Sequence, residues 1–258
     1  MPFSAPSFLQ ILDDRSFGPS LEEGSGPSVR IVVLGASGRL GRHVVRTCAA
    51  AGHPVVAVTR SCAVPPAAGL VRWASLAPAA VEGHRRMFAE ADAVIDARNQ
   101  RYDDWSGYPA MIDATLAALA GTAAHYLSVD NIYLYGQPGT PRPIDEAAPR
   151  HPISAKGQIR QAVERRLMQA MDTYPIAIAR FPDFYAIATD PLPRGVRWFG
   201  PPDLPHQFIH LPDAARALLW LTEDYQSRGQ VWHVAGADPI AGTDLRDLAQ
   251  AVSRAPRA

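Results

Sequence analysis

The chain has 258 residues, enough for one large α/β domain with an added cap or for two small domains. Its 25 basic residues balance its 25 acidic residues, which argues against nucleic acid as a partner. No stretch approaches the roughly 18 continuous apolar residues of a membrane span, and no basic segment leads into an apolar one at the N-terminus, so we expect a cytoplasmic protein. Cys48 and Cys62 are too few for a disulfide framework.

Residues 1–28 are rich in Pro, Ser and Gly, and we interpret them as an N-terminal arm that either covers the site or a neighbouring subunit, or is flexible. Beyond them, buried-strand patterns alternate with helical ones. Strands are predicted at residues 29–34, 55–59, 70–73, 93–97, 126–129, 176–180 and 231–234. Helices are predicted at residues 40–51, 108–120, 154–172, 212–223 and 243–253. The alternation predicts an α/β fold with a doubly wound parallel sheet.

A glycine pattern, Gly35, Gly38 and Gly41, follows the first predicted strand and opens the first predicted helix. Glycines in this context allow a tight turn and a close approach of the backbone to a pyrophosphate, which the amides of a helix N-terminus bind. We therefore predict a Rossmann-type dinucleotide site that includes Ser37, Arg39 and Leu40. A tight turn without a ligand is the alternative. Residues 29–180 would form the dinucleotide-binding core, and residues 181–258 a small substrate-binding cap interleaved with the last core elements.

The second predicted strand leads into Arg60, where an acidic residue would be expected in a protein that binds the free ribose 2′-hydroxyl of NAD. Arg60 and Arg39 together would pair with a 2′-phosphate, so the predicted cofactor is NADP, with NAD less favoured. The alternative is that both are solvated surface arginines.

The sequence resembles the short-chain dehydrogenase/reductase superfamily, specifically its extended and atypical, NAD-dependent epimerase/dehydratase-like branch. The resemblance runs from about residue 29 to about residue 250, in matching order and spacing. It is carried by the glycine loop, residues 126–136, the segment from Lys156 to Arg160 with Glu164, residues 180–185 and residues 208–216.

The resemblance implies a Tyr-x-x-x-Lys pair and a hydroxyl residue, and this chain replaces all three. Lys156 falls at the tyrosine position, Arg160 at the lysine position and Val129 at the hydroxyl position. Ser128 comes one residue earlier, on the opposite face of the strand, and is kept as a cofactor-binding candidate. This substitution pattern is similar to that of atypical members of the superfamily.

The scarcest polar residues suggest what replaces the usual acid–base group. Lys156 is the only lysine, and Asn99 and Asn131 are the only asparagines. All three would converge at the carboxyl edge of the sheet. We predict Lys156, Tyr133 and Asn131 as catalytic residues, with Lys156 a cationic anchor or a proton donor and Tyr133 a second acid.

Other residues complete the predicted site. Asn99, Arg160 and Pro182 would contact the cofactor, and Asp130, Asp183 and Tyr185 the substrate. Four aromatic residues would line an apolar pocket or belong to the core: Trp105, Trp198, Phe199 and Phe208. His206 and His210 lack a third ligand in register, so no metal is predicted.

Three functions follow from these features. The first is an NAD(P)-dependent oxidoreductase or epimerase acting on a small organic molecule. The second is a lyase, cyclase or isomerase without a redox step, and the third is a catalytically silent NADP-binding regulatory protein. The protein would be a monomer or a homodimer.

Overall fold

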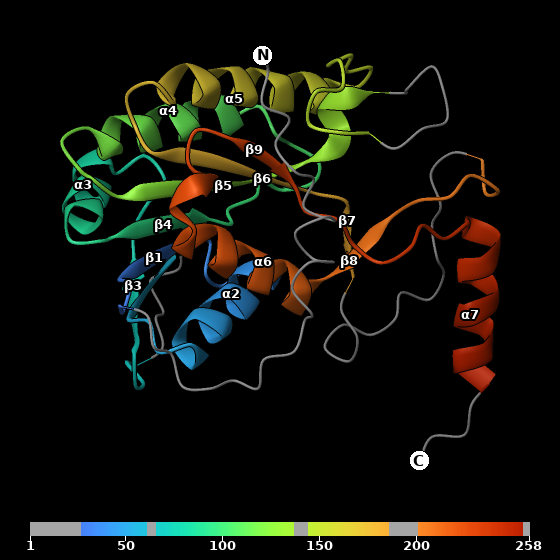
Figure 1. The fold of residues 1–258 in the computed structure, drawn as a ribbon, viewed down its shortest axis with the longest axis horizontal. Coiled ribbons are helices and arrows are strands. Elements are labelled where there is room, and N and C mark those ends of the chain that lie inside the picture. The colour runs from blue at the N-terminus through green and yellow to red at the C-terminus, as the bar shows by residue number, and fades with distance from the viewer. Residues whose placement is uncertain (1–26, 61–65, 137–143, 186–200, 255–258) are drawn as a thin grey trace.

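A seven-stranded parallel sheet lies at the centre of the computed structural model, which describes residues 27–60, 66–136, 144–185 and 201–254 (Figure 1). The strand order is β3-β2-β1-β4-β5-β6-β9. The strands are β1 (Ile31–Leu34), β2 (Val55–Thr59), β3 (Val71–Ser75), β4 (Ala93–Asp96), β5 (His125–Asn131), β6 (Ile176–Phe181) and β9 (Val231–His233). Continuous apolar runs such as Ile31–Leu34 are buried on both faces, which is the environment of a central parallel strand.

Helices cover both faces of the sheet (Figure 1). On one face, α2 (Arg39–Ala50) and α6 (Leu211–Glu223) pack together against the strands. On the other face lie α3 (Val81–Ala89), α4 (Tyr108–Leu119) and α5 (Ala155–Ala170). Side chains of each strand alternate between these two cores, and the predicted doubly wound α/β fold is therefore confirmed.

Several elements differ from the prediction. Helix α3 was not predicted, because Gly83 and a polar run interrupt its pattern and it buries only His84 and Phe88. No strand was predicted between β6 and α6, but β7 (Asp183–Tyr185) pairs in parallel with β8 (Phe208–His210). Short turns η1 (Ile132–Tyr135) and η2 (Tyr225–Ser227) and the last helix α7 (Gly242–Arg254) complete the described elements.

Strand β9 pairs with β6 at the edge of the main sheet, and α6 packs on α2. The chain after β6 therefore contributes both a strand and a helix to the Rossmann core. Among the described residues, no helix is long and apolar enough to cross a bilayer. Cys48 is buried. Most of the predicted arm, together with Cys62, Trp198 and Phe199, lies outside the described residues.

Candidate functional site

A cavity of about 450 Å³ opens at the carboxyl edge of the sheet, beside the ends of β1, β2, β4 and β5. Doubly wound sheets bind their ligands at this edge. The cavity brings together ten of the residues predicted from the sequence: Gly35, Ser37, Gly38, Arg39, Leu40, Arg60, Asn99, Asp130, Asn131 and Arg160.

The glycine loop has the geometry of a phosphate cradle. Gly35 has φ +75°, and a methyl group on it would lie 2.9 Å from the carbonyl of Ala97. A methyl group on Gly41 would collide with the carbonyl oxygen of Gly35. Gly38 caps α2 without a side-chain hydrogen bond, so no side chain occupies the first-turn amides of the helix. These residues fit the pyrophosphate of a dinucleotide, which approaches such amides directly.

The loop is tied to the end of β2. The hydroxyl of Ser37 lies 3.0 Å from that of Thr59, which holds the loop against the second strand. Arg39 and Arg60 both line the cavity and are both exposed. Two guanidinium groups therefore lie at the end of the cavity where the sequence predicted a phosphate contact.

Arg160 forms the polar centre of the cavity. Its side chain is buried, and NH2 donates a hydrogen bond of 3.4 Å to Oδ1 of Asn99. NH1 lies 3.4 Å from Oδ1 of Asp130. The guanidinium also lies over the rings of Trp105 and Tyr108, at 4.7 and 4.3 Å from their centroids. Trp105 and Tyr108 are themselves buried, so the plane of the arginine is held from several sides.

Asp130 is held by a second buried arginine. Nε and NH2 of Arg180 donate to Oδ2 of Asp130 at 3.1 and 3.0 Å, and NH2 also donates to Glu164 at 2.8 Å. Arg180 is fully buried. Although Asp130 lines the cavity, its carboxylate faces two arginines of the protein, so the geometry favours a role in orienting Arg160 over the predicted contact with substrate.

Lys156 does not line the cavity, so the predicted convergence with Asn99 and Asn131 is not found. Lys156 lies four residues before Arg160 on α5, about 6 Å further along the helix axis. Its Nζ lies 2.9 Å from the ring centroid of Tyr102 and 5.3 Å from that of Trp105. The ammonium group therefore rests on aromatic rings outside the nucleotide cavity.

Tyr133 stacks on Trp105, with ring centroids 5.9 Å apart and an interplanar angle of 9°. It is half-buried, and burial, followed by the charge of Asp183, raises the pKa of its phenol to about 12. At neutral pH the phenol therefore keeps its proton and acts as a hydrogen-bond donor. Asn131 accepts a 3.1 Å hydrogen bond from the amide of Tyr133 through Oδ1, so its carbonyl oxygen caps η1 and its amino group remains available to the cavity.

Tyr133 and five further predicted residues do not line the cavity. Ser128 is buried and Gly41 lies beneath the loop, whereas Pro182 is buried between β6 and β7. Asp183 pairs with His206 at 3.0 Å, and Tyr185 stacks on His210 at 5.2 Å. The unpredicted pairing of β7 with β8 explains the last two positions, because it places these side chains beside β8.

Sequence reasoning missed several cavity residues: four follow strands β3 and β4, one lies in the unpredicted helix α3, and three lie in β7, α4 and α6. These are Leu76, Pro78, His84, Arg98, Gln100, Met111, Phe184 and Leu211. Arg98 could have been predicted, because it comes two residues after β4 and ligands bind at the carboxyl ends of such strands. Trp105 and Phe208 do not line the cavity. Among the described residues, no group of three His, Cys, Asp or Glu side chains is arranged to hold a metal ion.

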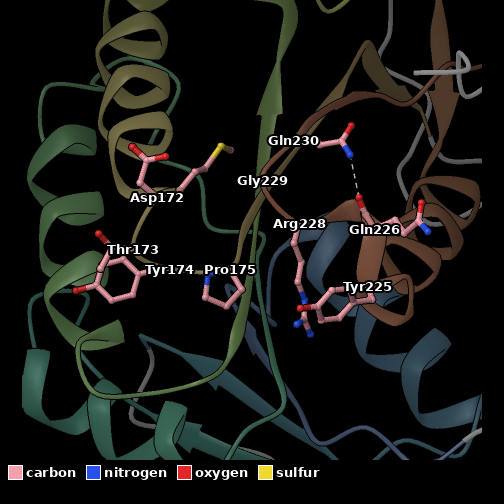
Figure 2. Close-up of a pocket in the computed structure, with 10 residues that line it drawn as sticks. Asp172, Thr173, Tyr174, Pro175, Tyr225, Gln226, Arg228, Gly229 and Gln230 are labelled. Atoms are coloured by element: carbon pink, nitrogen blue, oxygen red, sulfur yellow. Dashed lines mark hydrogen bonds between the residues drawn. The ribbon is translucent and has the colours of Figure 1, made fainter. Parts of the chain in front are cut away.

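Figure 2 shows a second hollow, of about 590 Å³, between the segments that precede β6 and β9. Its polar side chains include Asp172 and Arg228, and the guanidinium of Arg228 lies 4.2 Å from the ring centroid of Tyr225. Because β6 and β9 begin here, this hollow is at the amino edge of the sheet, opposite the glycine loop. The site for a dinucleotide is therefore the smaller cavity at the carboxyl edge.

The sheet order, the glycine loop and the cavity at the carboxyl edge are those of the Rossmann-type folds, and the resemblance to the extended short-chain dehydrogenase/reductase branch is confirmed at the level of the fold. A model of the NmrA-like family matches residues 27–82. The chain is also 28% identical, over 237 residues, to 2′-dehydrokanamycin reductase of Streptomyces kanamyceticus. That match covers 84% of this chain, which spans 65% of the length of the reductase.

Solved structures give the same assignment of the fold. UDP-glucose 4-epimerase of Thermotoga maritima, solved with UDP-glucose, is 18% identical, with a TM-score of 0.73 and coverage of 89% of this chain and 84% of the epimerase. WbmG of Bordetella bronchiseptica, solved with NAD and UDP, is 20% identical, with a TM-score of 0.73 and coverage of 90% and 80%.

Proposed function

We propose that this chain is an NADP-dependent reductase of a small carbonyl compound. The observation that carries the proposal is the glycine loop, which opens onto a cavity bounded by two arginines at one end and by Asn131 and Arg160 at the other. The relatives support an enzyme of this general kind, since they are reductases and epimerases by name. When bound, the reduced cofactor would supply a hydride to the carbonyl carbon.

The arginines at the end of β2 support the preference for NADP. Arg39 and Arg60 are exposed to the cavity, and the last residues of β2 include no carboxylate to bind a free ribose 2′-hydroxyl. A guanidinium fits a phosphate with paired hydrogen bonds, whereas a hydroxyl offers it only one acceptor. NADP should therefore bind more tightly than NAD.

At the other end of the cavity, Arg160 and Asn131 would hold the reactive part of the cofactor and the substrate. Arg160 is buried and is held in place by Asn99 and Asp130. Because its guanidinium stays protonated, Arg160 would orient ribose hydroxyls or phosphate and would not transfer a proton to the substrate. Reduction of the carbonyl also requires one proton at its oxygen. Tyr133, which keeps its proton at neutral pH, and Lys156 are the candidate donors on this side of the fold.

The test has two parts. Calorimetry with NADP and NAD is expected to show tighter binding of NADP, and Arg60→Glu is expected to remove that preference. Arg46→Glu is the matched control, because Arg46 is an exposed arginine of α2 that does not line the cavity. If neither dinucleotide binds, or if Arg60→Glu keeps the preference for NADP, the cofactor proposal is wrong.

The second part is turnover. We expect NADPH to be oxidised by at least one member of a panel of ketones and oxidised sugars, including 2′-dehydrokanamycin, because the curated relative is named as its reductase. Conversion of a substrate in the absence of any dinucleotide would instead indicate a lyase or isomerase. Tight NADP binding without oxidation of any panel compound would indicate a cofactor-binding protein without turnover.

A further inference from the structure

A line of hydrogen bonds leaves the cavity at Asp130 and ends at His233 on the edge strand β9. Between these two residues it passes through Arg180 and Tyr135, which are only 1% and 3% exposed. Neither Tyr135 nor His233 was predicted to take part in the site, and neither lines the cavity. The line nevertheless connects both of them to a carboxylate that does.

The backbone fixes the direction of the bonds in the outer half of this line. The carbonyl oxygen of Ile144 lies 3.1 Å from Nδ1 of His233 and can only accept, so the proton of the ring is on Nδ1 and Nε2 is an acceptor. The hydroxyl of Tyr135 lies 2.6 Å from Nε2 and therefore donates its proton there. The oxygen of the same hydroxyl accepts from NH1 of Arg180.

The inner half of the line decides which oxygen of Asp130 faces Arg160. Nε and NH2 of Arg180 both donate to Oδ2 of Asp130, at 3.1 and 3.0 Å. Among the described residues, Oδ1 of Asp130 has no hydrogen bond and faces NH1 of Arg160 at 3.4 Å. A rotation of the Arg180 guanidinium would therefore release Asp130, and with it the carboxylate that holds Arg160 in the cavity.

We infer that Tyr135 and His233 are positioning residues for Arg160, which they hold through Arg180 and Asp130. The inference rests on the proposed function, in which Arg160 binds the cofactor. Only a neutral ring of His233 can accept the proton of Tyr135, because a protonated imidazole has a donor on both nitrogens. The line should therefore hold Arg160 in place when His233 is neutral and lose its hold when His233 is protonated.

Charged groups on three sides set the protonation of His233. Glu146 accepts a 2.7 Å hydrogen bond from the backbone amide of His233 and favours the protonated ring, whereas Arg180 and Arg150 favour the neutral one. Burial has the largest effect and lowers the pKa of His233 from its ordinary value of 6.5. Burial also raises the pKa of the Tyr135 phenol, which therefore keeps the proton that it donates. The ring of His233 is thus neutral near neutral pH and is protonated only below pH 6.5.

Three substitutions test the line through the dissociation constant of NADP, which calorimetry measures without turnover. Tyr135→Phe removes the hydroxyl and keeps the ring, and His233→Leu removes the acceptor. Each should weaken NADP binding about two- to tenfold near neutral pH, the range expected for the loss of one hydrogen bond. His233→Gln supplies an uncharged acceptor for Tyr135 and should restore the affinity of the wild type.

The pH profile of NADP affinity separates positioning from a purely structural role. Wild-type affinity should fall below pH 6.5, because a bound cofactor that keeps Arg160 in place opposes the protonation of His233. The 2′-phosphate of NADP also gains a proton, at about pH 6, so part of the fall is expected in every variant. His233→Gln cannot gain a proton at this position, and its affinity should fall less steeply than that of the wild type.

His125→Gln is the matched control. His125 is a second buried histidine with a lowered pKa, and it lies at the start of β5, at the amino edge of the sheet. The control should keep the wild-type profile of NADP affinity, and circular dichroism checks that each variant is folded. Should His233→Leu fail to fold, Tyr135→Phe and the profiles of the two glutamine variants decide the question.

The possible results separate the positioning role from the proposed function. Unchanged NADP affinity in Tyr135→Phe or in a folded His233→Leu overturns the positioning inference alone. A profile of His233→Gln identical to that of the wild type, or a profile of His125→Gln as shallow as that of His233→Gln, does the same. Failure of the wild type to bind either NADP or NAD overturns the proposed function, on which the inference rests.

Discussion

Lys156 and Arg160 lie one turn apart on α5, and only Arg160 reaches the nucleotide cavity. Arg160 is buried between Asn99, Asp130 and two aromatic rings, whereas Lys156 places its ammonium group on the ring of Tyr102. The two cations should therefore act on different parts of the reaction: Arg160 on the cofactor, and Lys156 on the substrate side.

Replacing each cation separately tests this division. Arg160→Ala should weaken NADP binding by about tenfold or more, since hydrogen bonds to charged groups contribute about 1.5–3 kcal/mol. Lys156→Ala should leave the dissociation constant of NADP unchanged and lower turnover by about 100-fold if it donates the proton. Titration calorimetry and single-turnover kinetics measure the two effects. A loss of NADP affinity in Lys156→Ala would show that the lysine contacts the cofactor after all.

The buried ion pairs of Arg180 predict a large effect on stability. Arg180 is fully buried and donates to both Asp130 and Glu164, so Arg180→Met leaves two buried carboxylates with reduced compensation. Breaking such a buried pair from one side costs about 3–5 kcal/mol. Urea denaturation should show this loss in the free energy of unfolding.

Arg166→Met serves as the control for Arg180→Met. Arg166 pairs with Asp113 at 2.8 Å, but both side chains are more than a third exposed. Surface pairs of this kind contribute about 0–1 kcal/mol. Similar losses in the two variants would mean that the buried network is not what stabilises the carboxyl edge of the sheet.

The glycine loop predicts a strong effect at Gly41. An alanine there places a methyl group against the carbonyl oxygen of Gly35, so α2 has to move away from the loop. We expect a loss of about 1–3 kcal/mol of stability from overpacking and weaker NADP binding. Gly107→Ala is the comparison, because Gly107 has φ −78° and its nearest neighbour is 4.0 Å from the added methyl group. Thermal unfolding measures the stability of the two variants, and calorimetry measures their affinity for NADP. Equal values for Gly41→Ala and Gly107→Ala would contradict the close packing of this loop.

Acid should destabilise the protein through His125. Burial, and then the charge of Arg228, lower the pKa of His125 to about 4 from an ordinary value of 6.5. Between these values the unfolded chain binds a proton that the folded chain does not, so the free energy of unfolding falls as the pH drops from 6.5 towards 4. The slope approaches about 1.4 kcal/mol per pH unit for one histidine.

His125→Leu should reduce that slope, as measured by urea denaturation at a series of pH values. The slopes are compared rather than the stabilities at a single pH, since the substitution also changes packing. Burial lowers the pKa of His84 and His233 as well, so part of the acid dependence is expected to remain. An identical slope in the variant would show that the folded and unfolded chains protonate His125 alike, so that folding does not lower its pKa.

Much of the fold was accessible from the sequence, because local pattern determines it. The strand predicted at residues 55–59 coincides with β2, and the predicted alternation gives the sheet that is observed. Helix α3 was missed because Gly83 and His84 interrupt its short apolar pattern. The pairing of β7 with β8 joins two segments that are far apart in the chain, and no local pattern indicates it.

The site was predictable only in part. The glycine loop and Arg60 were predicted correctly as cavity residues, because each directly follows a strand that the sequence pattern identifies. The bond between Arg160 and Asn99 joins residues 61 positions apart, and the depth of Arg98 depends on its pairing with Asp96. Lys156 was assigned to the cavity from its rarity, but its position one turn before Arg160 places it outside.

The register of β7 and β8 also bears on how the protein could change over evolution. The pairing is parallel and sets Asp183 opposite Phe208 and Tyr185 opposite His210, and Phe184 and Leu211 at this junction line the cavity. A change in the length of the chain between two paired strands adds little entropic cost of closure. Related proteins could acquire new substrates through changes in the length of the chain between Tyr185 and Phe208 while keeping the same glycine loop.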